Sequence, residues 1–362
     1  MYSSGTFAKN FSPVMSSKRK SVAIWLLIGV VMIMVQVLLG GVTRLTGSGL
    51  SITEWKPIMG ALPPMNDAEW DKAFGGYKQI AQYKYLNSHF TLEDFQFIFF
   101  WEWLHRLWAR LLGVVFAVGF VYFLVRKYFD KEMILPFVIL FALGALQGLI
   151  GWIMVQSGLN ETDLYVSHIK LALHFMAALL LLCYTLWFAL QLLVKKEAFI
   201  VHPPLRRWLL LTLLLLVIQL TYGAFMAGLK AAPAAPTFPL INGDWVPPTV
   251  GTESWINHPI NVQFIHRQLA YLLATLLIFL GGALYRTAKK QNRGLLKRFS
   301  LYTVGLVLLQ IALGIGTILM AHKMGTARFG SYEGFAEAHQ LVAMLLLCAL
   351  VVDFFLVRSA RK

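Results

Sequence analysis

Eight long apolar runs, separated by shorter polar segments, dominate the pattern of hydrophobic and polar positions along the chain. Each run is long enough to cross about 30 Å of hydrocarbon as a helix, which takes about 20 residues. The pattern therefore predicts an all-α integral membrane protein with eight transmembrane helices. The predicted spans are residues 22–42, 98–125, 134–156, 171–194, 208–229, 262–285, 299–321 and 336–357.

Two of the polar segments are too long to be simple turns. Residues 43–97 begin with loop-forming residues and continue as an amphipathic stretch from Trp70 to Tyr85. This stretch predicts one or two short helices on the outer interface, with Trp and Tyr side chains at the level of the lipid headgroups. Residues 230–261 contain six prolines, which predicts an irregular outer segment.

Composition and charge agree with a membrane protein. Only 14% of the 362 residues are charged, whereas soluble domains carry about 25%. Twenty of the lysines and arginines lie at the termini and in the connections 126–132, 195–207 and 286–298, and nine lie in the connections on the opposite side. The positive-inside rule therefore places both termini on the cytoplasmic or matrix side. The net charge of +15 then meets anionic lipid headgroups, and no nucleic-acid partner is expected.

The first 20 residues carry four basic and no acidic side chains, without an apolar run that leads to a small-residue cleavage site. We interpret them as a cytoplasmic tail, and a short organellar transit peptide is the alternative. The lack of a long presequence favours the inner (cytoplasmic) membrane of a bacterium over the mitochondrial inner membrane.

The chain contains an internal repeat of a four-helix unit. Gln-x-x-x-Gly occurs near the outer end of every odd-numbered span, and a histidine occurs near the outer end of every even-numbered span. Corresponding residues of the two halves are 161 to 165 positions apart. Since each unit has an even number of spans, both copies share one orientation. The repeated residues are Gln36/Gly40, Gln147/Gly151, Gln219/Gly223 and Gln310/Gly314, with His105, His174, His266 and His339.

The sequence thus predicts two pseudo-symmetric four-helix bundles. Gln-x-x-x-Gly is explained most simply by close helix packing through small residues, although the Gln side chains could also hydrogen-bond a buried group. The predicted parts are a cytoplasmic tail 1–20, an N-terminal half 21–194 with the outer segment 43–97, a cytoplasmic linker 195–207, a C-terminal half 208–357 and a tail 358–362.

Four histidines at equivalent positions of a repeated bundle predict metal ligation. A single histidine in a membrane helix is more often a packed, hydrogen-bonded residue, but two imidazoles at similar depth in each half suit axial ligation of a flat metal macrocycle. Zinc fits less well because it takes about four N or S ligands, and a di-iron site needs several carboxylates. Glu102-x-x-His105 occurs once, and we expect no other span to offer a buried acid at this depth.

Glu102 is the most informative difference between the halves. A carboxylate is costly in hydrocarbon and marks a functional site by default. On a helix Glu102 shares a face with His105, and Gln263 occupies the corresponding position of the second half. We therefore interpret the half with the carboxylate as the one that does chemistry and the half with Gln263 as the one that transfers electrons.

Arginines follow the first histidine of each half. Arg106 and Arg267 either extend to the outer interface or pair with the propionates of a haem, and the two roles are compatible. Arg110 lies one turn deeper than Arg106 and has no counterpart, since Tyr271 occupies the equivalent position. It could belong to the N-terminal site or pair with Glu102.

Other polar residues are weaker candidates. His168 lies just outside the fourth span, and Asp353 lies near the opposite end of its helix from the histidines. Cys183 and Cys348 are expected to be core residues, because no C-x-x-C pair or haem-attachment motif is present. The other histidines, in loops or at span ends, are His89, His202, His258 and His322.

Several motifs together resemble the haem A synthases, over roughly residues 21–357. They are Gly-Gly-Val-Thr-Arg-Leu-Thr-Gly-Ser-Gly-Leu-Ser (40–51) with Thr53-Glu54-Trp55-Lys56-Pro57, Glu102-x-x-His105-Arg106, Gln147-Gly148-x-x-Gly151, Ser157-Gly158-Leu159, His174, Gln263-Phe264-x-His266-Arg267 and His339-Gln340. Some bacterial members have cysteine pairs in outer loops, whereas this chain is similar to the subclass without them, shared by proteobacterial and mitochondrial enzymes.

The resemblance implies an oxidoreductase that converts the C8 methyl of haem O into a formyl group, by two hydroxylations and loss of water. It implies a haem b cofactor between His266 and His339, substrate haem O between His105 and His174, and Glu102 as the catalytic acid. Two histidine ligands leave the iron no open coordination position for oxygen. Either one histidine dissociates during turnover, or the iron acts by electron transfer. The electron donor, a ferredoxin or a quinol, and the source of oxygen stay open, as do haem O synthase and cytochrome oxidase assembly factors as partners.

Rival functions are a di-haem, cytochrome b-like quinol dehydrogenase, a transporter and a haem O synthase. The first predicts equivalent halves, against the Glu102/Gln263 difference. A transporter predicts a pair of broken helices at mid-membrane, which the sequence lacks. A haem O synthase needs paired aspartate motifs for a prenyl diphosphate and magnesium, and none is present.

Overall fold

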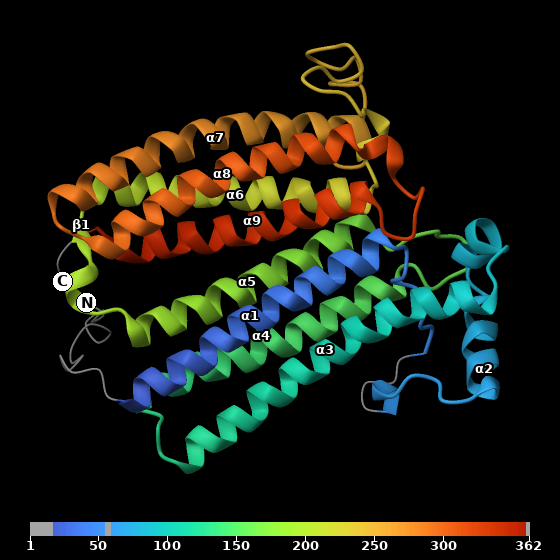
Figure 1. The fold of residues 1–362 in the computed structure, drawn as a ribbon, viewed down its shortest axis with the longest axis horizontal. Helices are drawn as coiled ribbons and strands as arrows, with labels where there is room; N and C mark the ends of the chain where they lie inside the picture. Colours follow the sequence, from blue (N-terminus) through green and yellow to red (C-terminus); the bar gives the residue numbers. More distant parts are fainter. Residues whose placement is uncertain (1–16, 55–58, 360–362) are drawn as a thin grey trace, which may run out of the picture.

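The computed structural model describes residues 17–54 and 59–359, in which eight long helices form a bundle (Figure 1). All eight are long and apolar enough to cross a membrane, so the predicted spans and the all-α class are confirmed. Residues 1–16, 55–58 and 360–362, which include most of the predicted tails and Trp55 to Pro57 of the signature, lie outside the described residues. The helices are α1 Ser17–Leu45, α3 Leu92–Val125, α4 Lys131–Gln156, α5 His168–Leu193, α6 Pro203–Gly228, α7 Pro259–Lys290, α8 Gly294–Leu319 and α9 Ser331–Leu356.

Each helix begins three to six residues before the predicted span, and at the starts of α3, α5 and α6 a side chain caps the helix beyond the apolar run. Thr91 and Asp94 form a capping box at the start of α3, and the side chain of Ser167 accepts from the backbone of Lys170 at the start of α5. Such caps satisfy N–H groups that have no partner inside the helix. The helices therefore extend out of the apolar layer.

The long outer segment folds as predicted into short helical pieces: η1 Met59–Ala61, α2 Asp67–Tyr77 and the π-helical turn η2 Tyr83–Asn87. Phe74 and Tyr77 of this segment pack their rings against Phe95 of α3. Tyr77 is fully buried, and burial raises the pKa of its hydroxyl to about 12, so that it stays protonated and bonded to Gln82 and Asn87. The segment forms a small apolar cluster of its own at the outer end of α3.

The proline-rich outer segment is irregular, as predicted, with one short turn, η4 Ala232–Ala234. Two further turns are η3 Lys196–Ala198 and η5 Ala321–Lys323. At the opposite, inner end of the bundle, strand β1 Ile200–Val201 pairs in parallel with β2 Val357–Arg358. This pairing joins the predicted linker to the end of the chain.

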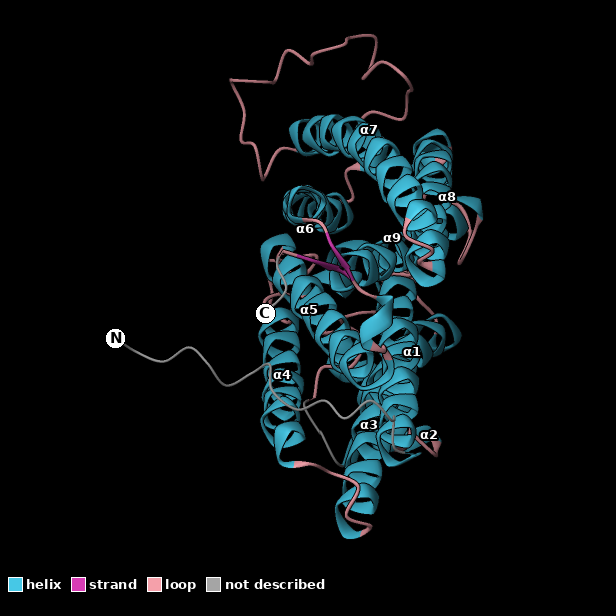
Figure 2. Ribbon diagram, turned by 90° about the vertical axis from the view of Figure 1, so that its left-hand side faces the viewer, coloured by secondary structure: helices cyan, strands magenta, loops and turns pink. Residues whose placement is uncertain are grey.

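The helices fall into two groups, α1, α3, α4 and α5 below and α6 to α9 above in Figure 2. The two groups share one apolar core, which includes Leu182 and Leu186 of α5 with Leu347 and Leu350 of α9. Helix α9 packs against α1, α5 and α6 besides α8. The two halves of the repeat are therefore one continuous membrane body.

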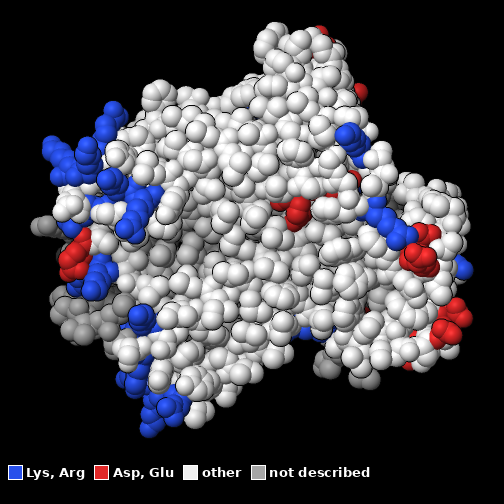
Figure 3. Space-filling view, in the orientation of Figure 1, with Lys and Arg blue, Asp and Glu red and all other residues white. Residues whose placement is uncertain are grey.

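Charge is distributed along the bundle as the sequence predicts. Figure 3 shows Lys and Arg side chains gathered at the end of the molecule that Figure 1 marks with both termini. Acidic side chains are more frequent at the other end, which carries the long loops. We call these the inner and outer ends, following the positive-inside rule.

The crossing of α7 and α8 depends on a glycine. A Cβ at Gly281 would overlap Cγ2 of Val304 and lie 3.3 Å from the carbonyl oxygen of Ser300, whereas a Cβ at the adjacent Gly282 would meet no atom within 4 Å. Overpacking a close contact costs about 1–3 kcal/mol.

Gly281→Ala should therefore lower the thermal unfolding midpoint of the purified protein in detergent. Gly282→Ala is the matched control and should leave the midpoint unchanged or raise it, since Ala favours helix by about 1 kcal/mol. Equal midpoints for the two variants would contradict the close α7–α8 packing.

Candidate functional site

Each of the four histidine rings predicted to be ligands packs against a glycine of a neighbouring helix. His105, His174, His266 and His339 pack with their Cε1 edges against Gly40, Gly151, Gly223 and Gly314, where a Cβ would lie 2.9, 2.7, 3.3 and 3.0 Å from Cε1. Real Cβ atoms do not approach other atoms below 3.0 Å, so at least two of these positions need glycine. Each Gly of Gln-x-x-x-Gly thus receives the histidine of the next long helix.

The glutamines of the same motifs contact the same histidines. Gln219 and Gln310 bring their amide nitrogens to 3.3 and 3.1 Å from Nε2 of His266 and His339. Gln147 donates to the carbonyl oxygen of His174 at 3.1 Å, and Gln36 donates to that of His105 at 3.2 Å. Both parts of the prediction for Gln-x-x-x-Gly are therefore confirmed: the glycine allows close packing, and the Gln side chain contacts a buried group. The repeating element is a helix pair, in which one helix supplies Gln and Gly and the next supplies the histidine that they hold.

In the C-terminal half, the two imidazoles face each other across the bundle. The ring centroids of His266 and His339 lie 6.4 Å apart, and the ring planes are inclined by 69°. Two metal–imidazole bonds of about 2 Å, with about 1 Å from each nitrogen to its ring centre, span about 6 Å. The observed separation therefore matches a metal held between the two rings.

Hydrogen bonds fix the orientation of His339. Its Nδ1 lies 3.1 Å from the carbonyl oxygen of Gln310, so Nδ1 carries the proton and Nε2 keeps its lone pair. Histidines that bind metals usually donate their other N–H in this way. Nδ1 of His266 is buried without a hydrogen-bond partner among the described residues. Nε2 of His339 accepts from the Gln310 amide at 3.1 Å in this structure, so the donor set fits a bis-histidine haem whose iron takes the place of that hydrogen bond.

The N-terminal pair shares the glycine contacts but differs in its glutamine contacts: the Gln147 amide lies 3.3 Å from Nδ1 of His174, and the Gln36 amide donates to the carbonyl oxygen of His105. His105 on α3 and His174 on α5 are close enough to interact electrostatically, and Nδ1 of His105 is buried without a partner among the described atoms. Within residues 17–54 and 59–359, no group of three or more His, Cys, Asp or Glu side chains could hold a metal ion. Pairs of imidazoles, rather than clusters, are therefore the candidate ligands.

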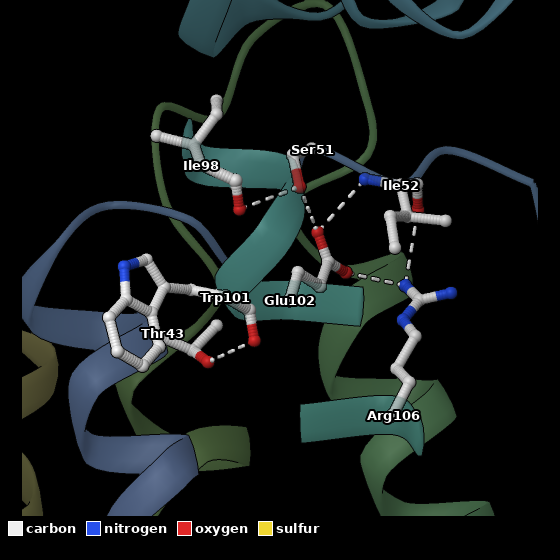
Figure 4. Close-up of polar contacts among 7 residues, drawn as sticks. All are labelled: Thr43, Ser51, Ile52, Ile98, Trp101, Glu102 and Arg106. Carbon is white, nitrogen blue, oxygen red and sulfur yellow. Dashed lines mark hydrogen bonds and ion pairs between the residues drawn. The ribbon is translucent and has the colours of Figure 1, made fainter. Parts of the chain in front are cut away.

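Glu102 clamps the outer loop to α3 (Figure 4). It is 3% exposed, and its Oε2 accepts from the hydroxyl of Ser51 at 2.7 Å and from the backbone N–H of Ile52 at 2.9 Å. Its Oε1 pairs with Arg106, one turn along, at 2.6 Å. Arg106 also donates to the carbonyl oxygen of Ile52 at 3.1 Å. Both oxygens of the carboxylate are engaged, which suits the ionised form, an acceptor only.

Gln263 and Arg267 clamp the other outer loop in the equivalent place. Gln263 is fully buried and donates to the carbonyl oxygen of Ala235 at 2.8 Å. Arg267 donates to the carbonyl oxygens of Ala235, Thr237 and Leu240, at 3.2, 2.7 and 3.3 Å. The two halves therefore use the same two positions to hold their long outer segments. These contacts give Arg106 and Arg267 a loop-holding role that the sequence did not reveal.

One buried acid was missed. Glu337 lies two residues before His339 on α9, and both of its carboxylate oxygens are buried without a hydrogen-bond partner among the described residues. Its Oε2 occupies the place where Gly41 of α1 would carry a Cβ. The expectation that no other span offers a buried acid at this depth was therefore wrong. The position looked interfacial in the sequence because it opens a span, and the packing of α9 against α1 buries it.

The remaining candidates lie away from the histidine pairs. His168 begins α5, and its Nε2 contacts the carbonyl oxygen of Ile256 at 3.1 Å. Asp353, fully buried, accepts from the hydroxyl of Thr303 at 2.8 Å near the inner end. Cys183 and Cys348 are free and pack against the shared core, as expected. Arg110 lies on α3, one turn inward from Arg106.

Fold and site define a class: a multi-pass membrane protein of two similar four-helix groups, each with two histidines packed on glycines of the preceding long helix. Comparison with known proteins agrees with this class. A family model described as cytochrome oxidase assembly protein matches residues 23–351. The chain belongs to this family, and within it to the haem A synthases, on the following similarities.

Haem A synthase of Rhodospirillum centenum is 42% identical over 349 residues, which cover 94% of this chain and 89% of that protein. The haem A synthases of Flavobacterium johnsoniae and Nitrosomonas eutropha are each 38% identical. The first similarity covers 93% of this chain and 97% of that protein, and the second covers 96% of each. The resemblance read from the motifs is therefore confirmed, and with it a place in haem A biosynthesis.

Removing the hydroxyl that binds Glu102 should loosen the outer loop. Ser51→Ala deletes a hydrogen bond to a charged group, worth about 1.5–3 kcal/mol, and should speed tryptic cleavage at Lys72, Lys78 and Lys84 in detergent. Ser88→Ala, at an exposed position of the same segment, is the control. A cleavage rate no higher than that of the control would show that the clamp does not hold the segment.

Proposed function

We propose that this protein oxidises the C8 methyl group of haem O to the formyl group of haem A. The supporting observation is that each half has a pair of histidines, and that Glu102 stands one turn before the first histidine of the N-terminal half, where the C-terminal half has Gln263. Two successive hydroxylations would give a gem-diol, which becomes the aldehyde by losing water. The family and the eight apolar helices support the inner membrane of a bacterium as its location.

The C-terminal half would hold haem b between His266 and His339. The 6.4 Å separation of the rings and the Nδ1 contact of His339 support this assignment. A haem with two histidine ligands supplies one-electron transfer. The protein's part there is to fix both rings: Gly223 and Gly314 admit them, and Gln219 and Gln310 orient them.

The N-terminal half would hold substrate haem between His105 and His174. Glu102 would act here in one of two ways. As a buried anion, it would stabilise positive charge that develops on the substrate during oxidation. As the partner of Ser51, Ile52 and Arg106, it would keep the outer loop closed and water excluded. Gln263, the counterpart of Glu102 in the C-terminal half, has a similar shape but no charge. This fits a half that only transfers electrons.

Arg106 and Arg110 stay candidates for pairing with substrate propionates, and Arg267 stays one for the cofactor. Arg267 donates hydrogen bonds to the carbonyl oxygens of Ala235, Thr237 and Leu240 in the outer loop. A guanidinium has five N–H donors, so binding a loop and a propionate with one arginine is compatible. In that case each clamp would couple loop closure to occupation of its site.

Haem extraction with mass identification tests the function. Purified wild-type protein should contain haem b together with haem O, its hydroxylated form or haem A. Glu102→Gln should keep its haem and lose product by about 100-fold, if the charge acts on the transition state with about 3 kcal/mol. A protein that is fully active without haem would refute the proposal.

The Ser51→Ala variant separates the two roles of Glu102. If the charge matters, Ser51→Ala should keep most of the product that Glu102→Gln loses. Equal losses in both variants would assign the effect of Glu102 to loop closure. Loss of haem from Glu102→Gln would make the residue structural.

The cofactor assignment is tested by ligand replacement. His266→Met and His339→Met should each remove or shift the low-spin haem b signal in the absorption spectrum, because the axial ligand sets the electronic state of the iron. Thr303→Ala, remote from both pairs, is the control. An unchanged spectrum in either methionine variant would reject haem b in the C-terminal half.

A further inference from the structure

The two halves differ in how their second and third long helices meet. In the C-terminal half, α7 packs along α8, whereas among the described residues α3 and α4 are not a closely packed pair. Ring contacts join α3 to α4 in their inner halves, where Phe116 and Phe120 meet Phe137 and Phe141 at centroid distances of 4.8 to 6.4 Å. The N-terminal half is therefore looser at this seam.

The repeat explains the difference in terms of side-chain size. With the offsets of the two halves, Phe120 and Phe141 correspond to Gly281 and Val304. Phe120 and Phe141 stack edge to face with their rings 5.2 Å apart, whereas Gly281 lets Val304 touch the backbone of α7. Phenylalanine pairs therefore hold α3 and α4 apart where a glycine draws α7 and α8 together.

Further toward the outer end, the small residues are in the N-terminal half and the large ones are in the C-terminal half. Gly144 and Gly148 of α4 correspond to Val307 and Ile311 of α8. Val307 is 4% exposed, and Ile311 packs against the shared core. Gly144 and Gly148 are exposed, and a Cβ on either would meet no atom within 4 Å. The side chains that fill this seam in the C-terminal half are absent from the N-terminal half.

An open hollow lies at this place. It has a volume of about 560 Å³ and is lined by Gly148, Leu149, Trp152 and Gln156. Gly148 shares a helix face with Phe141, seven residues before it, and with Val155, seven residues after it. Val155 packs with the outer cluster around Phe95. All four residues that line the hollow belong to α4, in the stretch between Phe141 and the end of the helix.

The hollow adjoins the N-terminal histidine pair. Gln147 and Gly151, the neighbours of Gly148 on α4, both contact His174. A group that leaves the edge of a macrocycle held by His174 would pass over Gly148 and reach the lipid beside Leu149 and Trp152, which are 52% and 38% exposed. Such an apolar exit suits a long alkyl chain, because lipid hydrocarbon solvates it as well as a protein core would.

Building on the proposed function, we propose that the hollow on α4 between Phe141 and Val155 receives the isoprenoid side chain of the substrate haem. Haem b has no such chain, so the closed seam of the C-terminal half suits a cofactor without a tail. The seam therefore decides which haem each half takes.

Closing the hollow with the residues of the other half tests this role. The double variant Gly144→Val with Gly148→Ile should fold, because both side chains enter open space. Added bulk in an apolar pocket changes binding by about tenfold or more. We expect haem O bound per protein, and its affinity in a spectral titration, to fall about tenfold, with haem b content and haem b affinity unchanged.

Gly305→Ile is the matched control, since Gly305 is an exposed glycine of α8 with no atom within 4 Å of a built Cβ. It should bind both haems as the wild type does. Unchanged haem O binding in the double variant, or equal loss of haem O and haem b, would overturn the proposal. Failure of the proposed function has a different signature, because wild-type protein would then take up no haem O.

Discussion

The structure depends on the contact between a histidine edge and a glycine of the neighbouring helix. It occurs four times, and each time the ring fills the space of a missing Cβ. A ring seated this way cannot turn freely, because the glycine backbone limits one edge and a glutamine of the same helix contacts the histidine. Ligand geometry is thus set by helix packing. Protein interiors resist compression, so the same packing that stabilises the bundle keeps His266 and His339 at their ring separation of 6.4 Å.

The outer clamps extend this logic to the loops. Glu102 with Arg106 and Gln263 with Arg267 lie one turn or less from His105 and His266, and each pair holds the backbone of a long outer segment. Buried charges are expensive unless paired and hydrogen-bonded. The loops supply the missing partners, and in return they are fixed over the site. Loop position and site electrostatics are therefore one property, and a change in either alters the other.

The sequence predicts the spans because a helix must be apolar over the thickness of hydrocarbon. It also predicts that four histidines take equivalent places in the two halves, because duplication repeats them. It does not predict the helix ends, since caps such as Thr91 and Asp94 lie outside the apolar pattern. Nor does it reveal Glu337, which is buried only where α9 meets α1, nor the carbonyl partners of Arg267, which come from a loop about 30 residues away. Contacts between distant elements depend on packing that no local pattern encodes.

Duplication sharpens the argument about function because it provides an internal reference. The ligands are the same in both halves, so they do not explain why the halves differ. Two other features change together in the N-terminal half: a charge replaces an amide at Glu102, and glycines replace Val307 and Ile311 along the seam. The first change has no effect on helix packing and the second has none on charge, so packing stability alone does not account for both. Under the proposed function, a site that must both react with a haem and admit one bearing a long chain requires the two changes at once, whereas a site that only transfers electrons requires neither.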